Sequence, residues 1–524
     1  WERIKKKKKT GDIDAKLKFS TQDAGYGSPT AANDYSLLYR NATSGEFEEI
    51  AVTSQRTFGD KVIFEVANAD LENGYYTLGV PKYREWYTLI SGDWDSWETW
   101  TLDPSGALPN NPNQFTPSTS PTANIDKVHI LSGKTVTVGS DNKSNALIEV
   151  KGRLDFGTTT GHSFDEIRGN GRIILYGDNF PVGDASHFTT QGEGEGTVVY
   201  KGSGYSLTNS NTFYNVELIM NSNTDEVVLL NDYTINGDLL VENGVLKINN
   251  SSTDIRNLLV KKNVRVESNG KITVGSGDTY STHSQYHQFN VQGDFINKGT
   301  VKLTNRTAAG YESDDTGGAV ELIFNHPTQN QSLQCLNTSL FNQITIDKGI
   351  DKTYILDINA STSDYFKLYG RNDEEFSGDP GNRDGNKALR LLAGTAKLSS
   401  NIIIPVLAYD YSYDIDDDAR LWLNGASVTF PTGNSNNWLA IYGTLQISGT
   451  SEFIEQTNFG TLIRKQGTFL MENGTVELNN FRTSTWDEAG DHVGAYIQRG
   501  GTVTVNNESA NDDYATFHLP YETN

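Results

Sequence analysis

The chain of 524 residues contains a single cysteine, Cys335. One thiol excludes a disulfide framework within the chain. Secreted proteins without disulfides are commoner among bacteria than in the eukaryotic secretory route. The apolar neighbours Leu333 and Leu336 predict that Cys335 is a small core residue.

Long hydrophobic runs are also missing. No segment approaches the 18 consecutive apolar residues typical of a transmembrane helix, so we expect no transmembrane segment. Hydrophobic residues make up 36% of the chain, which is low for a globular enzyme, and helix-forming runs are scarce. A disordered chain would also be poor in hydrophobic residues, but 10% aromatic residues and steady strand alternation favour a folded β protein.

Cations are fewer than anions, with 43 basic and 66 acidic residues and a formal charge of −23. A surface of this sign repels nucleic acid and anionic membranes, so neither is an expected partner. The same surface suits a soluble extracellular protein that binds divalent cations.

A short phrase recurs along most of the chain: glycine, usually a polar residue, then Leu, Phe, Ile or Val. It begins at Gly152, Gly171, Gly196, Gly237, Gly244, Gly270, Gly293, Gly299, Gly443, Gly467, Gly474 and Gly501. The phrases or clusters of phrases lie about 19 to 27 residues apart, which is the length of one solenoid coil. Glycine permits a sharp corner, and the alternating residues after it form a short strand. The pattern predicts an all-β chain whose main part is a right-handed parallel β-helix.

The chain divides into three regions by pattern. Residues 1–83 contain strand-like segments separated by Gly, Asn and Ser turns, which predicts a small antiparallel β-sandwich-like region. Residues 84–125 are rich in tryptophan and then in Pro and Asn. Residues 126–524 carry the coil phrases and are expected to form the β-helix, which begins at residue 126.

Four of the eight tryptophans lie close together: Trp86, Trp94, Trp97 and Trp100. One interpretation is an aromatic platform for binding sugars. The other is a cap over the first coil, whose open strand edge would otherwise pair with other chains. We favour the cap.

A longer self-match lies within the coil region. Residues 197–218 and residues 320–346 share the same succession of strand-like segments at an offset of 124 to 128 residues. A unit of several coils has therefore been duplicated, which a solenoid tolerates because each coil contacts only its neighbours. About 15 coils spaced by about 4.8 Å predict a rod near 70 Å long.

Several phrases resemble the repeat regions of long secreted surface adhesins of Bacteroidetes, including gliding-motility adhesins exported by type IX secretion. The matching residues are Gly92-Asp93-Trp94, 97–100, 121–128, 133–136, the phrases at Phe213 and Phe341, and 420–425. The resemblance covers most of the chain and carries no catalytic motif. It implies an extracellular, cell-surface adhesin or filament segment, with export and anchoring machinery and a surface polysaccharide or other cell-surface ligand as partners. No type IX sorting domain is evident at 521–524, so the export route rests on analogy.

An enzyme is the main alternative, because polysaccharide lyases and hydrolases also use parallel β-helices. Their chemistry needs carboxylates, or a carboxylate with Lys and Arg, projecting from adjacent coils over one groove. The acidic pairs Asp314-Asp315, Glu374-Glu375 and Asp512-Asp513 sit beside turn residues, as solvated acids do. We expect no catalytic residues. A groove of aromatics and paired acids would favour an enzyme or glycan-binding module, and a uniform Asn, Thr and Ser face would favour an adhesin.

The best candidate for a metal site is Asp414, Asp416 and Asp418. Alternate carboxylates in a loop can converge on Ca²⁺, which takes six to eight oxygen ligands. The glycine and the distal glutamate of an EF-hand are missing. A solvated acidic corner is the competing interpretation, and no other cofactor is expected.

Overall fold

The computed structural model is almost entirely β-strand. It describes residues 5–7, 14–23, 29, 32, 35–79, 84–108, 117, 126–190, 192, 194–209, 211–249, 254–276, 286–305, 318–370, 387–405, 407, 413–430, 437–455, 459–482, 494–506 and 517–518.

The N-terminal region consists of two antiparallel sheets around one small core. The first sheet has the order β1 (Lys5–Lys7), β7 (Gly74–Gly79), β3 (Ser36–Arg40) and β4 (Glu48–Glu49). The second has the order β2 (Ala15–Ser20), β6 (Lys61–Val66) and β5 (Ser54–Phe58), and η2 (Asn68–Asp70) follows β6. Leu37, Phe64 and Tyr76 are buried between them. The predicted antiparallel region is confirmed.

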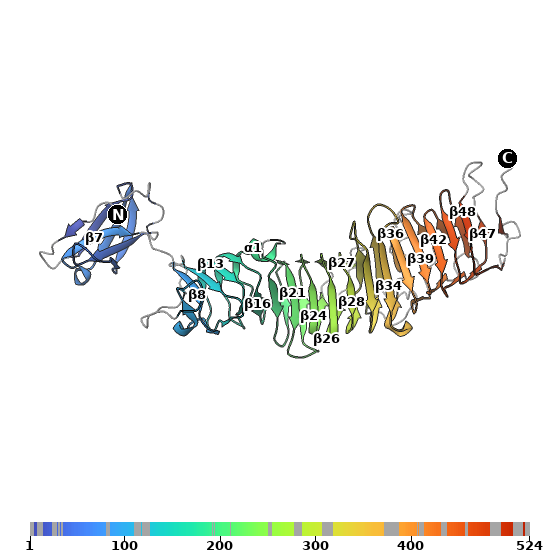
Figure 1. The fold of residues 1–524 in the computed structure, drawn as a ribbon, viewed down its shortest axis with the longest axis horizontal. Helices are drawn as coiled ribbons and strands as arrows, with labels where there is room; N and C mark the ends of the chain where they lie inside the picture. The colour runs from blue at the N-terminus through green and yellow to red at the C-terminus, as the bar shows by residue number, and fades with distance from the viewer. Residues whose placement is uncertain are drawn as a thin grey trace.

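The rest of the chain winds into a long parallel stack, which Figure 1 shows as a rod running from the blue strand β8 to the red strands β47 and β48. Within the described residues, fifteen successive parallel pairings connect β9 to β48. At about 4.8 Å per pairing the stack is about 70 Å long. The predicted parallel β-helix is confirmed.

That stack contains β9 (Gly92–Asp93), β12 (Thr135–Thr137), β14 (Arg153–Asp155), β16 (Arg172–Leu175), β18 (Thr197–Tyr200), β21 (Asn215–Ile219), β24 (Leu239–Ile248), β26 (Val264–Val274), β28 (Phe295–Asn297), β31 (Gln331–Cys335), β34 (Ile355–Ala360), β36 (Leu389–Ser399), β39 (Ala419–Asn424), β42 (Thr444–Ser448), β45 (Thr468–Met471) and β48 (Ala495–Gln498).

Further strands of each coil form the other faces. At the N-terminal end these are β8 (Glu85–Thr88), β10 (Trp100–Thr101), β11 (Lys127–Ile130), β13 (Ser144–Val150), β15 (Ser163–Arg168) and β17 (Val182–Asp184), with η3 (Trp97–Thr99) and α1 (Ser186–Thr189). In the middle they are β19 (Tyr205–Leu207), β20 (Asn211–Phe213), β22 (Glu226–Leu229), β23 (Tyr233–Ile235), β25 (Asn257–Val260), β27 (His287–Val291), β29 (Thr300–Lys302), β30 (Val320–Phe324), β32 (Ser339–Phe341), β33 (Gln343–Asp347) and β35 (Phe366–Leu368), with η5 (Ser363–Tyr365). At the C-terminal end they are β37 (Ile403–Ile404), β38 (Tyr413–Ile415), β40 (Ser427–Phe430), β41 (Asn437–Ile441), β43 (Glu452–Glu455), β44 (Phe459–Ile463), β46 (Thr475–Leu478), β47 (Phe481–Arg482), β49 (Thr502–Val505) and β50 (Phe517–His518).

The core of the rod follows from strand alternation, because successive side chains point to opposite sides of a strand. The parallel register places Val128 beside Trp86 and Ile148, and Ile148 beside Ile167. All four side chains are buried. Cys335 is buried in the same core, as predicted. Inward positions therefore form apolar rows along the axis, and the positions between them face outward.

Glycine at the corners is required by close stacking. A Cβ atom at Gly152 would lie 2.3 Å from the carbonyl oxygen of Lys134 in the coil before it. A Cβ atom at Gly171 would lie 2.3 Å from the carbonyl oxygen of Gly152. These contacts are too short for any other residue, which explains why glycine occupies these corners.

The solenoid begins earlier than the sequence suggested. The strands β8 and β9 pair in parallel with β11 and β12, so the first coil starts near Glu85 and not at residue 126. The region 84–125 is therefore partly a coil. Its strand β10 pairs antiparallel with β8 and covers the outer edge of that sheet, which is the role expected of a cap.

Three of the four clustered tryptophans belong to the core. The side chains of Trp86, Trp94 and Trp100 are at most 1% exposed, whereas Trp97 is 47% exposed. The indole NH of Trp86 donates to Asp126, and that of Trp100 donates to the carbonyl oxygen of Trp94. Buried rings cannot serve as a sugar-binding platform, so the cap interpretation holds for these three.

The duplicated unit has the same strand pairing in both copies. Val198 lies opposite Val216 in the first copy, and Leu322 lies opposite Ile344 in the second. The strands β19 and β20 pair with β22 and β23, just as β31 and β32 pair with β34 and β35. Residues matched in the sequence therefore occupy equivalent positions in two groups of coils.

Candidate functional site

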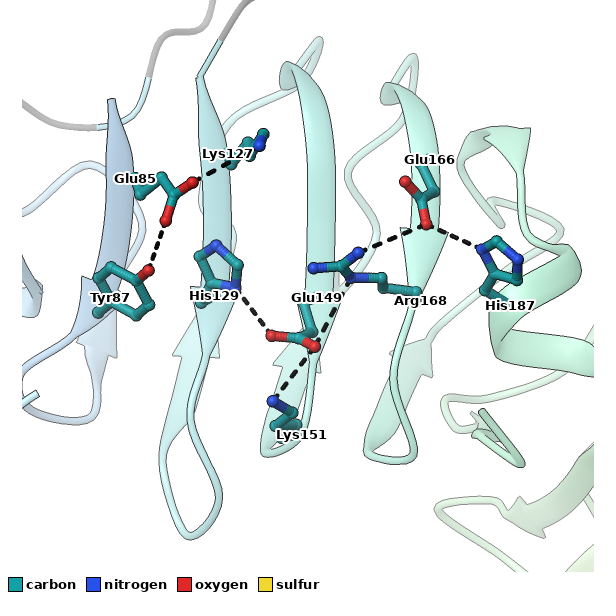
Figure 2. Close-up of polar contacts among 9 residues, drawn as sticks. All are labelled: Glu85, Tyr87, Lys127, His129, Glu149, Lys151, Glu166, Arg168 and His187. Atoms are coloured by element: carbon teal, nitrogen blue, oxygen red, sulfur yellow. Dashed lines mark hydrogen bonds and ion pairs between the residues drawn. The ribbon is translucent and has the colours of Figure 1, made fainter. Parts of the chain in front are cut away.

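Outward-facing side chains of the first coils form rows of charge across neighbouring strands (Figure 2). In the parallel register, His129 lies opposite Tyr87 on one side and Glu149 on the other. Glu149 in turn lies opposite Arg168. The set drawn in Figure 2, which we call the charged ladder, is Glu85, Tyr87, Lys127, His129, Glu149, Lys151, Glu166, Arg168 and His187.

Glu149 is the centre of the charged ladder. Its carboxylate lies 2.8 Å from His129 Nδ1, 3.2 Å from Lys151 Nζ and 3.6 Å from Arg168 Nε. The hydrogen bond with His129 lowers the pKa of Glu149 to about 2, against the opposing effect of burial and with further help from Lys151. Glu149 is therefore ionised at all ordinary pH values.

The two ends of the charged ladder are held by local contacts. The Tyr87 ring stacks on the His129 ring with centroids 4.6 Å apart, and its hydroxyl donates to Glu85 at 2.6 Å. This hydrogen bond lowers the pKa of Glu85. At the other end α1 packs beside β15 and brings His187 Nδ1 to 2.9 Å from Glu166.

A concave region of about 440 Å³ lies over the charged ladder. Its lining residues are Glu149, Lys151, Arg168, Gly169, Asn170, His187 and Gly194. Acids and bases lie close together here, as glycan-cleaving enzymes require. However, a carboxyl group with a pKa of about 2 is a poor proton donor or acceptor near neutral pH, because an efficient acid or base titrates near the working pH.

A second concave region of about 500 Å³ adjoins the first around the corner of the coils, and Lys151 and Asn170 line both. We call it the basic groove. It is lined by Gly133, Lys134, Thr135, Lys151, Gly152, Arg153, Asn170, Gly171, Arg172 and Thr197. Four of these residues are cationic and none is acidic.

A third concave region, of about 540 Å³, lies farther along the rod. It is lined by Leu240, Glu242, Arg265, Glu267, Ser268 and Asn269. The guanidinium of Arg265 forms an ion pair with Glu267 within this region. Its single cation is therefore neutralised by a neighbour.

The predicted calcium ligands lie at the end of a strand and in the turn after it. Asp414 is part of β38 between the buried side chains of Tyr413 and Ile415, whereas Asp416 and Asp418 are exposed. Across the described ranges, His, Cys, Asp and Glu side chains nowhere gather in threes that could hold a metal ion. The three carboxylates are thus not brought together, and calcium binding stays a prediction.

The acidic pairs noted in the sequence, Asp314-Asp315, Glu374-Glu375 and Asp512-Asp513, lie outside the described residues. Sequence analysis did not find the charged ladder or the basic groove. Two of the glycine phrases, at Gly152 and Gly171, contain Arg153 and Arg172 as their polar residues. An arginine at the same place in two successive phrases was the one sequence feature that could have pointed to the basic groove.

No protein-family model, curated protein or solved structure matches the chain. In the part of the chain that the structure describes, no helix combines the length and apolar character needed to cross a lipid bilayer.

Proposed function

We propose that the chain is a segment of an extracellular, cell-surface adhesin or filament, an elongated rod that serves attachment or gliding motility. The observation that carries the proposal is the uninterrupted stack from β9 to β48. In such a stack each coil contacts only its neighbours, so length is added without a new core. The product is a stiff spacer with extended outer faces.

The resemblance to secreted Bacteroidetes adhesins supports the same proposal and adds type IX export and surface anchoring to it. The ligand would be a surface polysaccharide or another cell-surface molecule. Many weak contacts along the rod, multiplied over many copies, would give firm attachment even where one contact is weak.

Adhesion can be tested with beads coated with the purified chain under shear flow over immobilised polysaccharides. We expect bead retention to rise much more steeply than the coating density, because attachment is multivalent. Albumin-coated beads provide the control. Absence of retention at every density and on every surface would contradict the proposal.

A carbohydrate-active enzyme is the second candidate, and the observation in its favour is the concave region over the charged ladder. The ionised state of Glu149 speaks against proton transfer by that residue. Incubation with acidic polysaccharides decides between the two candidates. Release of reducing ends or unsaturated sugars, abolished in Glu149→Gln and Arg168→Gln, would establish the enzyme and displace the adhesin.

A further inference from the structure

The basic groove runs along the rod axis over four successive coils. Thr135 lies opposite Arg153, Arg153 opposite Arg172, and Arg172 opposite Thr197. Three strand spacings separate the first from the last, a length of about 14 Å. The groove therefore presents a row of side chains to a ligand that lies parallel to the axis.

The glycine corners explain why this surface is hollow. Gly152 and Gly171 lie between the lysine or asparagine before them and the arginine after them. Any side chain at either position would collide with the backbone of the preceding coil, as shown above. The corner is consequently bare, and the cationic side chains stand on both sides of it.

The charges of the groove are only partly neutralised by the protein. Arg172 forms an ion pair with Glu217, Lys151 lies 3.2 Å from Glu149, and Lys134 Nζ donates to the carbonyl oxygen of Leu89 at 2.8 Å. Among the residues that the structure describes, the guanidinium of Arg153 has no hydrogen-bond or ion-pair partner. A cationic group without a partner is available to an incoming anion.

The positive charges of Arg153 and Arg172 also repel each other, because the two residues lie opposite each other on neighbouring strands. Like charges directly opposite on neighbouring strands are destabilising. Burial and then the charge of Arg153 lower the pKa of Arg172, with an opposing effect from Glu242. An anion placed between the two guanidinium groups would relieve this repulsion, and it would do so in a chain whose formal charge is −23.

The neutral residues of the groove narrow the class of anion. Asn170, Thr135 and Thr197 offer an amide and hydroxyls beside the cations, which suits a ligand bearing many hydroxyl groups. Arginine forks fit carboxylate and sulfate groups through paired hydrogen bonds. The formal charge of −23 repels any polyanion, and it repels duplex DNA strongly, because DNA carries about one negative charge per 1.7 Å of its axis.

We propose that the basic groove, centred on Arg153 and Arg172, binds an acidic polysaccharide that carries carboxylate or sulfate groups. The proposal rests on the adhesin function and names the ligand class of one of its contact sites. The polysaccharide lies along the axis with its acidic groups against the two guanidinium groups. Its hydroxyls contact the flanking threonines and Asn170.

Isothermal titration calorimetry with polygalacturonate oligomers, dextran sulfate, neutral dextran and a DNA duplex tests the proposal. We expect binding of at least one of the two acidic glycans, weakening as salt rises from about 50 to 200 mM. Which of the two binds distinguishes carboxylate from sulfate recognition. Neutral dextran and DNA should bind at least tenfold more weakly, and equal binding of either would overturn the proposal.

Arg153→Gln is the informative variant, because Arg153 has no partner within the described residues whose loss could unfold the coil. We expect affinity for the acidic glycan to fall at least fivefold, and further in Arg153→Gln/Arg172→Gln. Lys302→Gln removes an exposed cation at the end of β29, outside the groove, and should change affinity less than twofold. Unchanged affinity in Arg153→Gln, with thermal unfolding like the wild type, would overturn the proposal.

The failure of this proposal is distinguishable from failure of the adhesin function. If beads are retained on polysaccharide surfaces while the soluble chain binds neither acidic glycan, the basic groove is not the binding site, but the adhesin function stands. If beads are not retained and the soluble chain binds neither acidic glycan, both the adhesin function and the binding role of the basic groove are wrong.

Discussion

In the first coils, residues 85–200, the outward row through β8, β11, β13 and β15 carries charge. In the last coils, residues 389–505, the outward row through β39, β42 and β45 is neutral, because Trp422 lies opposite Gln446 and Gln446 opposite Leu470. Tyr87, His129, Glu149 and Arg168 form one outward row in the first coils. In the last coils the indole NH of Trp422 donates to Ser448, whose hydroxyl donates in turn to Asn424. Both regions have the same apolar interior.

The difference shows that fold and surface chemistry are specified separately in this chain. Inward positions and corner glycines fix the coil, so outward positions are free to vary. The neutral row of the last coils has the character expected of a passive spacer. The concave charged surfaces of the first coils have the character of a contact site.

The largest expected effect concerns the shared interior. Phe164→Ala removes a ring that is 1% exposed and packs near Trp94 and Phe156, and Phe469→Ala removes a fully buried ring beside Phe481 and Tyr496. Each substitution should cost about 4 kcal/mol of local stability. Because coils contact only their neighbours, hydrogen exchange should rise near the mutated coil alone. Uniform loss of protection along the rod would show that the two regions unfold as one.

Strand alternation and corner glycines made the interior predictable from sequence. Val476 and Leu478 alternate after Gly474, and both are buried. The start of the solenoid was missed because β8 is separated from its partner β11 by a long segment rich in Pro and Asn. The sequence of Glu85–Thr88 contains no local pattern that predicts parallel pairing with the distant strand β11.

The candidate site was hidden for a related reason. His129, Glu149 and Arg168 are 20 and 19 residues apart, and the coil length elsewhere varies. Since a shift of one residue reverses the face of a strand, contacts between coils require the register, which composition and spacing do not supply. The sequence shows an arginine after each of Gly152 and Gly171, but only the strand register shows that the two arginines lie opposite each other.

The next largest effect concerns Glu455 in the last coils. Its carboxyl group is 4% exposed and accepts hydrogen bonds from the Thr461 hydroxyl and from the backbone NH of Asn479. Burial raises its pKa from 4.5 to about 8. A raised folded pKa stabilises the fold fully below pH 4.5, and that contribution is lost as the pH rises toward 8.

The wild-type chain should therefore lose about 3 kcal/mol of local folding stability between pH 5 and 9, and Glu455→Gln should not. Local hydrogen exchange in β43 and β44 measures this difference. Glu452→Gln, an exposed change on the same strand, should leave the pH dependence intact. An identical pH profile in Glu455→Gln and the wild type would show that Glu455 is not the group responsible.

The smallest effect concerns His162 and has the opposite sign, which sharpens the contrast between the two regions. The ring is 2% exposed, stacks on Phe156 and accepts a hydrogen bond at Nδ1 from the backbone NH of Lys143. Burial lowers its pKa from 6.5 to about 4, with Asp141 opposing and the Lys143 charge reinforcing the shift. A lowered pKa means that stability is full above pH 6.5 and is lost as the pH falls toward 4.

Acid should thus loosen the first coils by about 2 kcal/mol while the last coils keep their protection, since Glu455 is protonated there. Hydrogen exchange followed from pH 7 to pH 4 reports β13 and β15 separately from β43 and β44 in one sample. His162→Gln should abolish the acid response in β13 and β15 only. If both regions loosened together in acid, or if the response survived in His162→Gln, His162 would not set the pH sensitivity of the first coils.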